Sequence, residues 1–209
     1  MKIGVIGATG RVGKFITAEA LDRGHSVRGF ARHMTLAHDR RLQLIQADIM
    51  AMTPTDIAGL DALVSAYRAP RGQERLYVTA AEALANLLKG TGVRLLVVGG
   101  AGSSFADETK TTRFYETPDF PESIYATSMY MARSTQVLDL APQLTWTYIS
   151  PAERFLADGP KTGAYRTSAG ILLRDADGRS EISMADYAVA VVDELEHPQY
   201  LNSQMAVAW

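Results

Sequence analysis

The sequence of 209 residues contains no cysteine. That absence excludes disulfide bonds, thiolate zinc sites, iron–sulfur clusters held by cysteine and a cysteine nucleophile. Histidine, the other common zinc ligand, occurs four times, and these residues do not have the spacing of metal ligands. We therefore expect all four on the surface: His25, His33, His38 and His197.

Long hydrophobic runs and an excess of one charge are also missing. No apolar run approaches about 18 residues, which argues against a membrane-spanning helix. The formal net charge is −2, so the chain has no electrostatic attraction to nucleic acid or to an acidic membrane. A strand-like run begins at residue 2 and leaves no room for a signal peptide, so we expect a cytoplasmic protein.

Short apolar runs rich in β-branched residues recur along the first 150 residues and predict buried strands. They lie at 2–6, 25–32, 42–48, 61–67, 93–100 and 144–150. Helical spacing of apolar residues appears after residue 12, over 77–89 and within 123–141. This alternation predicts βαβ units and a mostly parallel sheet with helices on both faces.

The pattern changes after Pro151. Residues 171–183 resemble a hairpin with Asp177 and Gly178 at its turn. A helix with a capping box formed by Ser183 and Asp186 follows, and then a short last strand. We predict one domain over 1–209, with 151–183 as a small insertion on the substrate side. The polar segment 104–121 lacks any period and is a candidate lid or binding loop.

Three glycines follow the first predicted strand at intervals of three residues. Gly7 permits a tight turn from strand to helix, Gly10 lets the backbone approach a pyrophosphate, and Gly13 lets the helix pack closely on the strand. The spacing is GxxGxxG, and its position within a βαβ unit predicts a dinucleotide site. A magnesium-dependent phosphate loop is the competitor, but Phe15 follows Lys14 where Ser or Thr is needed.

The second strand ends without an acidic residue that would bind ribose hydroxyls. Arg32 stands there instead, and its guanidinium suits a 2′-phosphate, which favours NADP(H) over NAD(H). Arg11 is a second candidate for the same phosphate, and both arginines have the alternative of a solvated surface position. Asp48, after the third strand, either accepts the adenine amine or caps the next turn.

Several segments together resemble an atypical short-chain dehydrogenase/reductase. They include GATGRVG, GFAR, QADI and VSAY near the start of the chain. The later segments LLVVGGAGS, WTYISPAERF and ISMADYAVAVVDELE are similar to bacterial NADH-flavin reductases, which are related to biliverdin-IXβ/flavin reductase and to NmrA-like proteins. This resemblance covers nearly the whole chain and implies a Rossmann-like doubly wound sheet with a small C-terminal lobe made of the hairpin and a helix.

The resemblance also implies roles for particular residues along the carboxyl ends of the strands. Ile49, beside Asp48, flanks the adenine, and Ser103 is the catalytic candidate, as a hydrogen-bond donor to the nicotinamide amide or to the acceptor. Its alternative role is to cap its loop. The remaining cofactor residues are assigned to the pyrophosphate (Gly7, Thr9, Gly10, Arg11, Val12, Gly13), the 2′-phosphate (Arg32), the ribose (Ala66, Tyr67) and the nicotinamide (Ser150, Pro151).

The main short-chain group uses a Tyr-x-x-x-Lys pair for proton transfer, and this chain lacks it. Tyr125 and Tyr130 lie on the expected helix, but Met129 and Ser134 follow four residues later. A conjugated acceptor that takes a hydride and draws its proton from water fits this absence. Tyr67 and Phe155 are candidates to line an aromatic acceptor.

Three functions stay open from the sequence. The first is an NADPH-dependent reductase of a small planar, flavin-like or quinone-like acceptor, with FMN or FAD as substrate rather than as a held prosthetic group. The second is a non-enzymatic NADP(H) sensor of the NmrA-like kind. The third is an epimerase or isomerase with transient hydride chemistry. A homodimer is possible, and no nucleic acid or membrane partner is expected.

Overall fold

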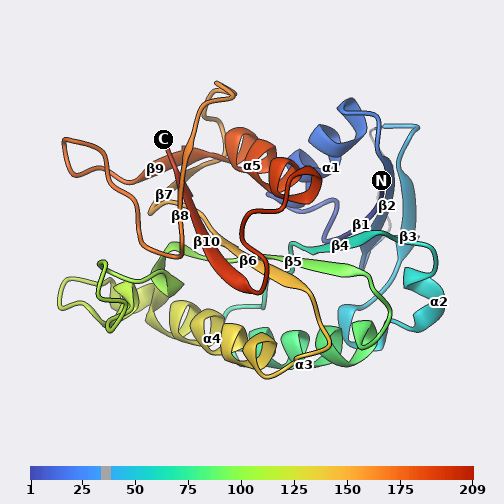
Figure 1. The fold of residues 1–209 in the computed structure, drawn as a ribbon, viewed down its shortest axis with the longest axis horizontal. Coiled ribbons are helices and arrows are strands. Elements are labelled where there is room, and N and C mark those ends of the chain that lie inside the picture. Colours follow the sequence, from blue (N-terminus) through green and yellow to red (C-terminus); the bar gives the residue numbers. More distant parts are fainter. Residues whose placement is uncertain (34–38) are drawn as a thin grey trace.

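The computed structural model describes residues 1–33 and 39–209, and it contains an eight-stranded sheet with helices on both faces (Figure 1). The strand order is β3-β2-β1-β4-β5-β6-β10-β8, parallel throughout except for β8, which runs antiparallel to β10. The predicted doubly wound, mostly parallel sheet is confirmed. Its strands are β1 (Lys2–Ile6), β2 (Ser26–Ala31), β3 (Gln43–Gln46), β4 (Ala62–Ser65), β5 (Arg94–Val98), β6 (Trp146–Ser150), β8 (Arg166–Ser168) and β10 (Ser203–Ala208).

Two pairs of helices cover the sheet, one pair on each face (Figure 1). The first pair is α1 (Gly13–Asp22) with α5 (Met184–Glu196), and the second is α3 (Leu76–Leu88) with α4 (Glu122–Asp139). A four-residue helix, α2 (Pro54–Ile57), buries Ile57 in the apolar cluster on the α3–α4 face, and short 3-10 turns lie at Ile49–Ala51, Ala101–Ser103 and Phe114–Glu116.

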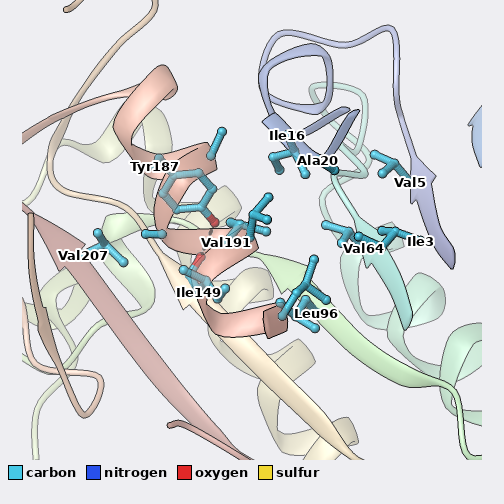
Figure 2. Packing of buried hydrophobic residues seen from close by; sticks show 14 of the residues in the cluster. Ile3, Val5, Ile16, Ala20, Val64, Leu96, Ile149, Tyr187, Val191 and Val207 are labelled. Atoms are coloured by element: carbon cyan, nitrogen blue, oxygen red, sulfur yellow. Dashed lines mark hydrogen bonds between the residues drawn. The ribbon is translucent and has the colours of Figure 1, made fainter. Parts of the chain in front are cut away.

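Each face of the sheet buries its own apolar cluster. Figure 2 shows the cluster between the sheet and the α1–α5 pair, where Ile16 and Val191 face strand residues such as Ile3. Tyr187 reaches across this cluster, and its hydroxyl donates to the Ile149 carbonyl oxygen at 2.7 Å. Because helices bury both faces, the central strands read as continuous apolar runs rather than alternating ones.

The predicted hairpin over 171–183 is wrong in its pairing, although its turn forms. The Asp175 carboxylate accepts from the amides of Asp177 and Arg179, which closes the turn. The flanking residues pair elsewhere: Ile171 bridges Phe105, and β9 (Glu181–Ser183) pairs in parallel with β7 (Arg154–Leu156). This distant pairing buries Ile182 completely, which a two-stranded hairpin in water does not achieve.

Only half of the predicted capping box forms at the start of α5. The Ser183 hydroxyl accepts from the amide of Asp186 at 2.9 Å. The Asp186 carboxylate instead accepts from Thr162, Gly163 and the indole of Trp209. It thereby fastens the segment between β7 and β8 to the helix and to the last residue of the chain.

Among the described residues, no helix combines the length and the apolarity that crossing a membrane requires. The prediction of a surface position is wrong for His25, whose side chain is only 11% exposed because it packs against Glu196, with the carboxylate 2.7 Å from its Nε2. His38 lies outside the described residues.

Candidate functional site

The turn between β1 and α1 leaves no room for a side chain at Gly7 and Gly13 and little room at Gly10. Gly7 has a φ of +74°, a conformation that strains other residues. A Cβ on Gly13 would lie 2.0 Å from the carbonyl oxygen of Gly7, and a Cβ on Gly10 would lie 3.0 Å from the same atom. The predicted turn at Gly7 and the close helix packing at Gly13 are confirmed.

The amides at the start of α1 are available to a ligand. Within the described residues, the N–H groups of Arg11, Val12 and Gly13 donate no hydrogen bond to the protein. The first turn of α1 also carries no acidic side chain. Free amides and the positive end of a helix dipole favour an anion, and a glycine turn lets it come close. These residues fit the pyrophosphate of a dinucleotide.

A first cavity, of about 370 Å³, lies beside this turn at the carboxyl ends of the strands. Its lining includes seven of the residues that the sequence predicted for the cofactor: Gly7, Thr9, Gly10, Arg32, Ile49, Ala66 and Tyr67. Ala66 meets the turn directly, because a Cβ on Gly7 would lie 2.8 Å from its carbonyl oxygen. The size and position of the cavity fit the adenosine half of the dinucleotide.

The charges of the first cavity are positive. Arg32 and Arg68 line it, and among its described lining residues there is no carboxylate. The chain thus places cations where an NAD-specific site places an acidic residue. Asp48 lies outside this lining, and its carboxylate accepts from the amide of Met50 at 2.9 Å, which is the turn-capping alternative. Its contact with adenine stays a prediction.

A second cavity, of about 620 Å³, continues from the first. Gly10, Ala66, Tyr67 and Arg68 line both cavities, so the two form one groove along the strand ends. Its lining also includes four residues that the sequence singled out: Arg11, Val12, Pro151 and Phe155. The remaining wall is largely aromatic and aliphatic, with Tyr77, Val98, Phe114, Phe120, Ile124 and Met131. Such a wall suits a planar apolar molecule.

The segment 104–121 forms one side of this second cavity. The backbone N–H of Phe105 donates to the Gly170 carbonyl oxygen, and the Phe105 carbonyl oxygen accepts from the Leu172 amide. The Arg113 guanidinium stacks on the Phe105 ring at 3.8 Å. Phe114 and Phe120 pack edge to face with ring centroids 5.1 Å apart, and both line the cavity. The predicted binding loop is therefore a folded wall of the groove; closure over a substrate stays a prediction.

Two predicted hydroxyl residues, Ser103 and Ser150, lie behind the groove rather than in its lining. Both are fully buried, and their Oγ atoms are 3.1 Å apart. Ser103 Oγ donates to the Gly100 carbonyl oxygen at 2.7 Å, and Gln204 of β10 donates to Ser150 Oγ at 2.8 Å. Ser103 thus caps its own turn, the alternative that the sequence left open. Contact of either serine with cofactor or acceptor stays a prediction.

Helix α4 turns one face towards the second cavity, and its tyrosines lie elsewhere. Tyr125 is 43% exposed and packs edge to face on Tyr115. Tyr130 lies under the Arg133 guanidinium at 5.5 Å. The residues of α4 that line the cavity are Ile124, Thr127, Ser128 and Met131. The sequence analysis missed them, although their spacing is that of one helix face.

The two tyrosines of the groove are poor acids. Burial raises the pKa of Tyr67, and the charge of Arg32 opposes this only in part. Burial also raises the pKa of Tyr77, which packs edge to face on Tyr67 with ring centroids 6.1 Å apart. Neither phenol is prepared to give up its proton near neutral pH.

The fold and the groove together define an α/β protein that binds a nicotinamide dinucleotide. Residues 7–198 match the family described as NAD(P)H-binding, and the chain belongs to this family. It is 42% identical over 208 residues to "Uncharacterized protein YwnB" of Bacillus subtilis (strain 168), covering 99% of this chain and 98% of that protein.

Two solved structures show the same architecture over the whole chain. One is described as a "putative NADH-flavin reductase" from Streptococcus pneumoniae TIGR4, with 40% identity, a TM-score of 0.94 and coverage of 100% of this chain and 99% of that one. The other is described as a "putative epimerase" from Bacteroides thetaiotaomicron, with 31% identity, a TM-score of 0.87 and coverage of 100% and 96%. The resemblance drawn from the sequence is confirmed.

Proposed function

We propose that this chain is an NAD(P)H-dependent oxidoreductase that reduces a small planar acceptor of the flavin or quinone kind. The observation that carries the proposal is the second cavity, which continues the dinucleotide groove and holds about 620 Å³ behind an aromatic wall. A protein that only senses the dinucleotide would place its nicotinamide half beside Arg11, Val12 and Pro151 in this cavity, and it has no need of the aromatic wall of Phe114 and Phe120 beyond them. The Streptococcus pneumoniae structure, whose name refers to flavin reduction, supports the same acceptor class.

The cofactor that we propose is NADPH in preference to NADH. Arg32 and Arg68 make the adenosine end of the groove cationic, and a 2′-phosphate dianion gains charge-assisted hydrogen bonds there. One such bond contributes roughly 1.5–3 kcal/mol, which is about ten- to a hundredfold in affinity.

In this proposal the side chains of the groove bind and orient the dinucleotide and the acceptor, and they do not transfer protons. When bound in this groove, NADPH would supply a hydride to the acceptor and leave as NADP⁺, and water would supply the proton that completes the two-electron reduction. Tyr67, Phe114 and Phe155 line the space in which a planar acceptor stacks, and they exclude water from its faces. The flavin, where it is the acceptor, binds as a substrate.

The test is anaerobic NADPH oxidation with riboflavin, FMN, FAD and menadione as acceptors. We expect turnover with at least one flavin or quinone, and a higher kcat/KM with NADPH than with NADH. Oxidation with none of the four, together with retained NADP(H) binding, would contradict the reductase and leave the sensor as the function.

A further inference from the structure

One face of helix α4 forms the floor of the second cavity. Ile124, Thr127, Ser128 and Met131 follow each other at helical spacing, and all four line the cavity. Thr127 and Met131 stand four residues apart, the same interval as a Tyr-x-x-x-Lys pair. The groups offered to a ligand on this face are therefore two hydroxyls and a thioether, none of which titrates near neutral pH.

The hydroxyl of Ser128 is not used by the protein itself. Within the described part of the chain, Ser134 donates to the Met131 carbonyl and Thr135 to the Ala132 carbonyl, as hydroxyls inside helices commonly do, whereas Ser128 makes no hydrogen bond. Ser128 is nevertheless only 6% exposed, and its exposed part faces the cavity. Its Oγ is not sealed from the cavity, so it is free to bond a ligand placed there.

Close packing fixes the place of this hydroxyl. A Cβ on Gly102 would lie 2.3 Å from Ser128 Oγ and 2.9 Å from the Phe120 ring, so the glycine leaves the space that the serine and the ring occupy. Gly102 and Phe120 line the same cavity. Ser128 Oγ thus stands against the aromatic wall at which we place the acceptor, while the hydroxyl of Ser103 is turned to Gly100.

We propose that Ser128 Oγ donates a hydrogen bond to a carbonyl oxygen of the acceptor. This inference rests on the proposed function and narrows its substrate class to planar acceptors with a carbonyl on or beside the ring that is reduced, such as flavins and quinones. A carbonyl-free dye of similar size fits the aromatic wall but offers nothing to this hydroxyl. Ser128 then fixes which edge of the acceptor enters the cavity.

The experiment compares Ser128→Ala with Ser134→Ala, a serine on the same helix whose hydroxyl is bonded to the backbone. KM and kcat are measured with riboflavin, menadione and the carbonyl-free dye methylene blue. We expect Ser128→Ala to raise KM for riboflavin and menadione about tenfold, the loss of one hydrogen bond to a buried group. KM for methylene blue and the affinity for NADP⁺ should not change, and Ser134→Ala should behave as wild type.

A binding measurement that needs no turnover accompanies the kinetics. Quenching of riboflavin fluorescence, with NADP⁺ bound to the protein, should show about tenfold weaker binding in Ser128→Ala. Thermal melting followed by circular dichroism establishes that both variants are folded.

Each result separates this inference from the proposed function. Equal KM changes for riboflavin and methylene blue would overturn it, because they would show a general change of packing. Unchanged riboflavin affinity would also overturn it. Weaker binding of NADP⁺ alone would overturn it too, because it would show that the Ser128 hydroxyl contacts the nicotinamide instead of the acceptor. Wild-type protein that neither binds riboflavin nor oxidises NADPH with any acceptor would refute the proposed function, and the role of Ser128 with it.

Discussion

At the scale of single residues, the features nearest to one another in sequence were the ones most readily predicted. The three glycines act within seven residues, and the steric reason for each is local: a positive φ at Gly7 and the Gly7 carbonyl oxygen against Gly10 and Gly13. Ser103 and Ser150 could not be understood in this way. Their hydroxyls are buried beside Gln204, which comes from β10 at the other end of the chain.

Arg32→Ala tests the cofactor preference. Removing the guanidinium should weaken NADPH binding about ten- to a hundredfold and leave NADH binding nearly unchanged, because only NADPH carries the 2′-phosphate. Fluorescence titration with both dinucleotides measures the two affinities. Arg71→Ala is the matched control, since Arg71 is exposed and lies outside the lining of both cavities. Equal losses of affinity for NADPH and NADH would show that Arg32 does not bind the 2′-phosphate.

At the scale of elements, the periodicity of apolar residues predicts where helices and strands lie. It does not predict which distant segments pair with each other. The stripe of α3 and the apolar run of β5 are set by burial on the sheet, which leaves its period in the sequence. The hairpin over 171–183 failed because the turn signal at Asp177 and Gly178 is local, while the pairing of β9 with β7 depends on burying Ile182. The cavity face of α4 was readable from its spacing, but only a structure shows which face meets the groove.

The two tyrosines of helix α4, Tyr125 and Tyr130, are predicted to take no part in catalysis. Tyr125→Phe and Tyr130→Phe, singly and together, should leave kcat for flavin reduction nearly intact, because neither side chain lines the groove. Steady-state NADPH oxidation with riboflavin measures this. A large loss of kcat with unchanged melting temperature would mean that one of these phenols does supply a proton.

The contact of α1 with α5 includes an ionic network around Arg23. Its guanidinium donates to Glu19, Asp193 and Glu196, and His25 Nε2 lies 2.7 Å from Glu196. Burial by itself raises the pKa of Glu196, but the hydrogen bonds from Arg23 and His25 outweigh it, and the pKa is lowered. A carboxyl with a lowered pKa stabilises the fold above its unfolded pKa, and this contribution is lost as the pH falls through the folded pKa.

Glu196→Gln should therefore lower the free energy of unfolding by about 1 kcal/mol at pH 7, and the difference from wild type should shrink below about pH 4.5. Urea denaturation at pH 7, 5 and 4 measures it. Glu108→Gln, at an exposed residue of the segment 104–121, is the control and should show no such dependence. A difference that stays constant with pH would show that the carboxylate charge is not what stabilises this contact.

At the scale of the whole molecule, the sheet order brings the parts of the groove together. Because β1, β4 and β5 are neighbours in the sheet, the glycine turn, the ends of β4 and β5 and the start of α4 meet at the carboxyl ends of the strands. The alternation of strands and helices predicted these strand ends as the site. It could not predict that the segment 104–121 folds as an aromatic wall there, because Phe105 is held by Gly170 and Leu172 from a distant part of the chain.

The central claim is that an adenine dinucleotide docks its pyrophosphate on the free amides of the first turn. Isothermal titration calorimetry of NADP⁺ and NADPH into wild type and Gly10→Val tests it most directly, because a Cβ at residue 10 would already lie 3.0 Å from the Gly7 carbonyl oxygen. We predict one dinucleotide bound per chain in the wild type, and no binding by a Gly10→Val variant that still melts cooperatively. Equal binding by both proteins, or no heat from the wild type at millimolar dinucleotide, would contradict the account.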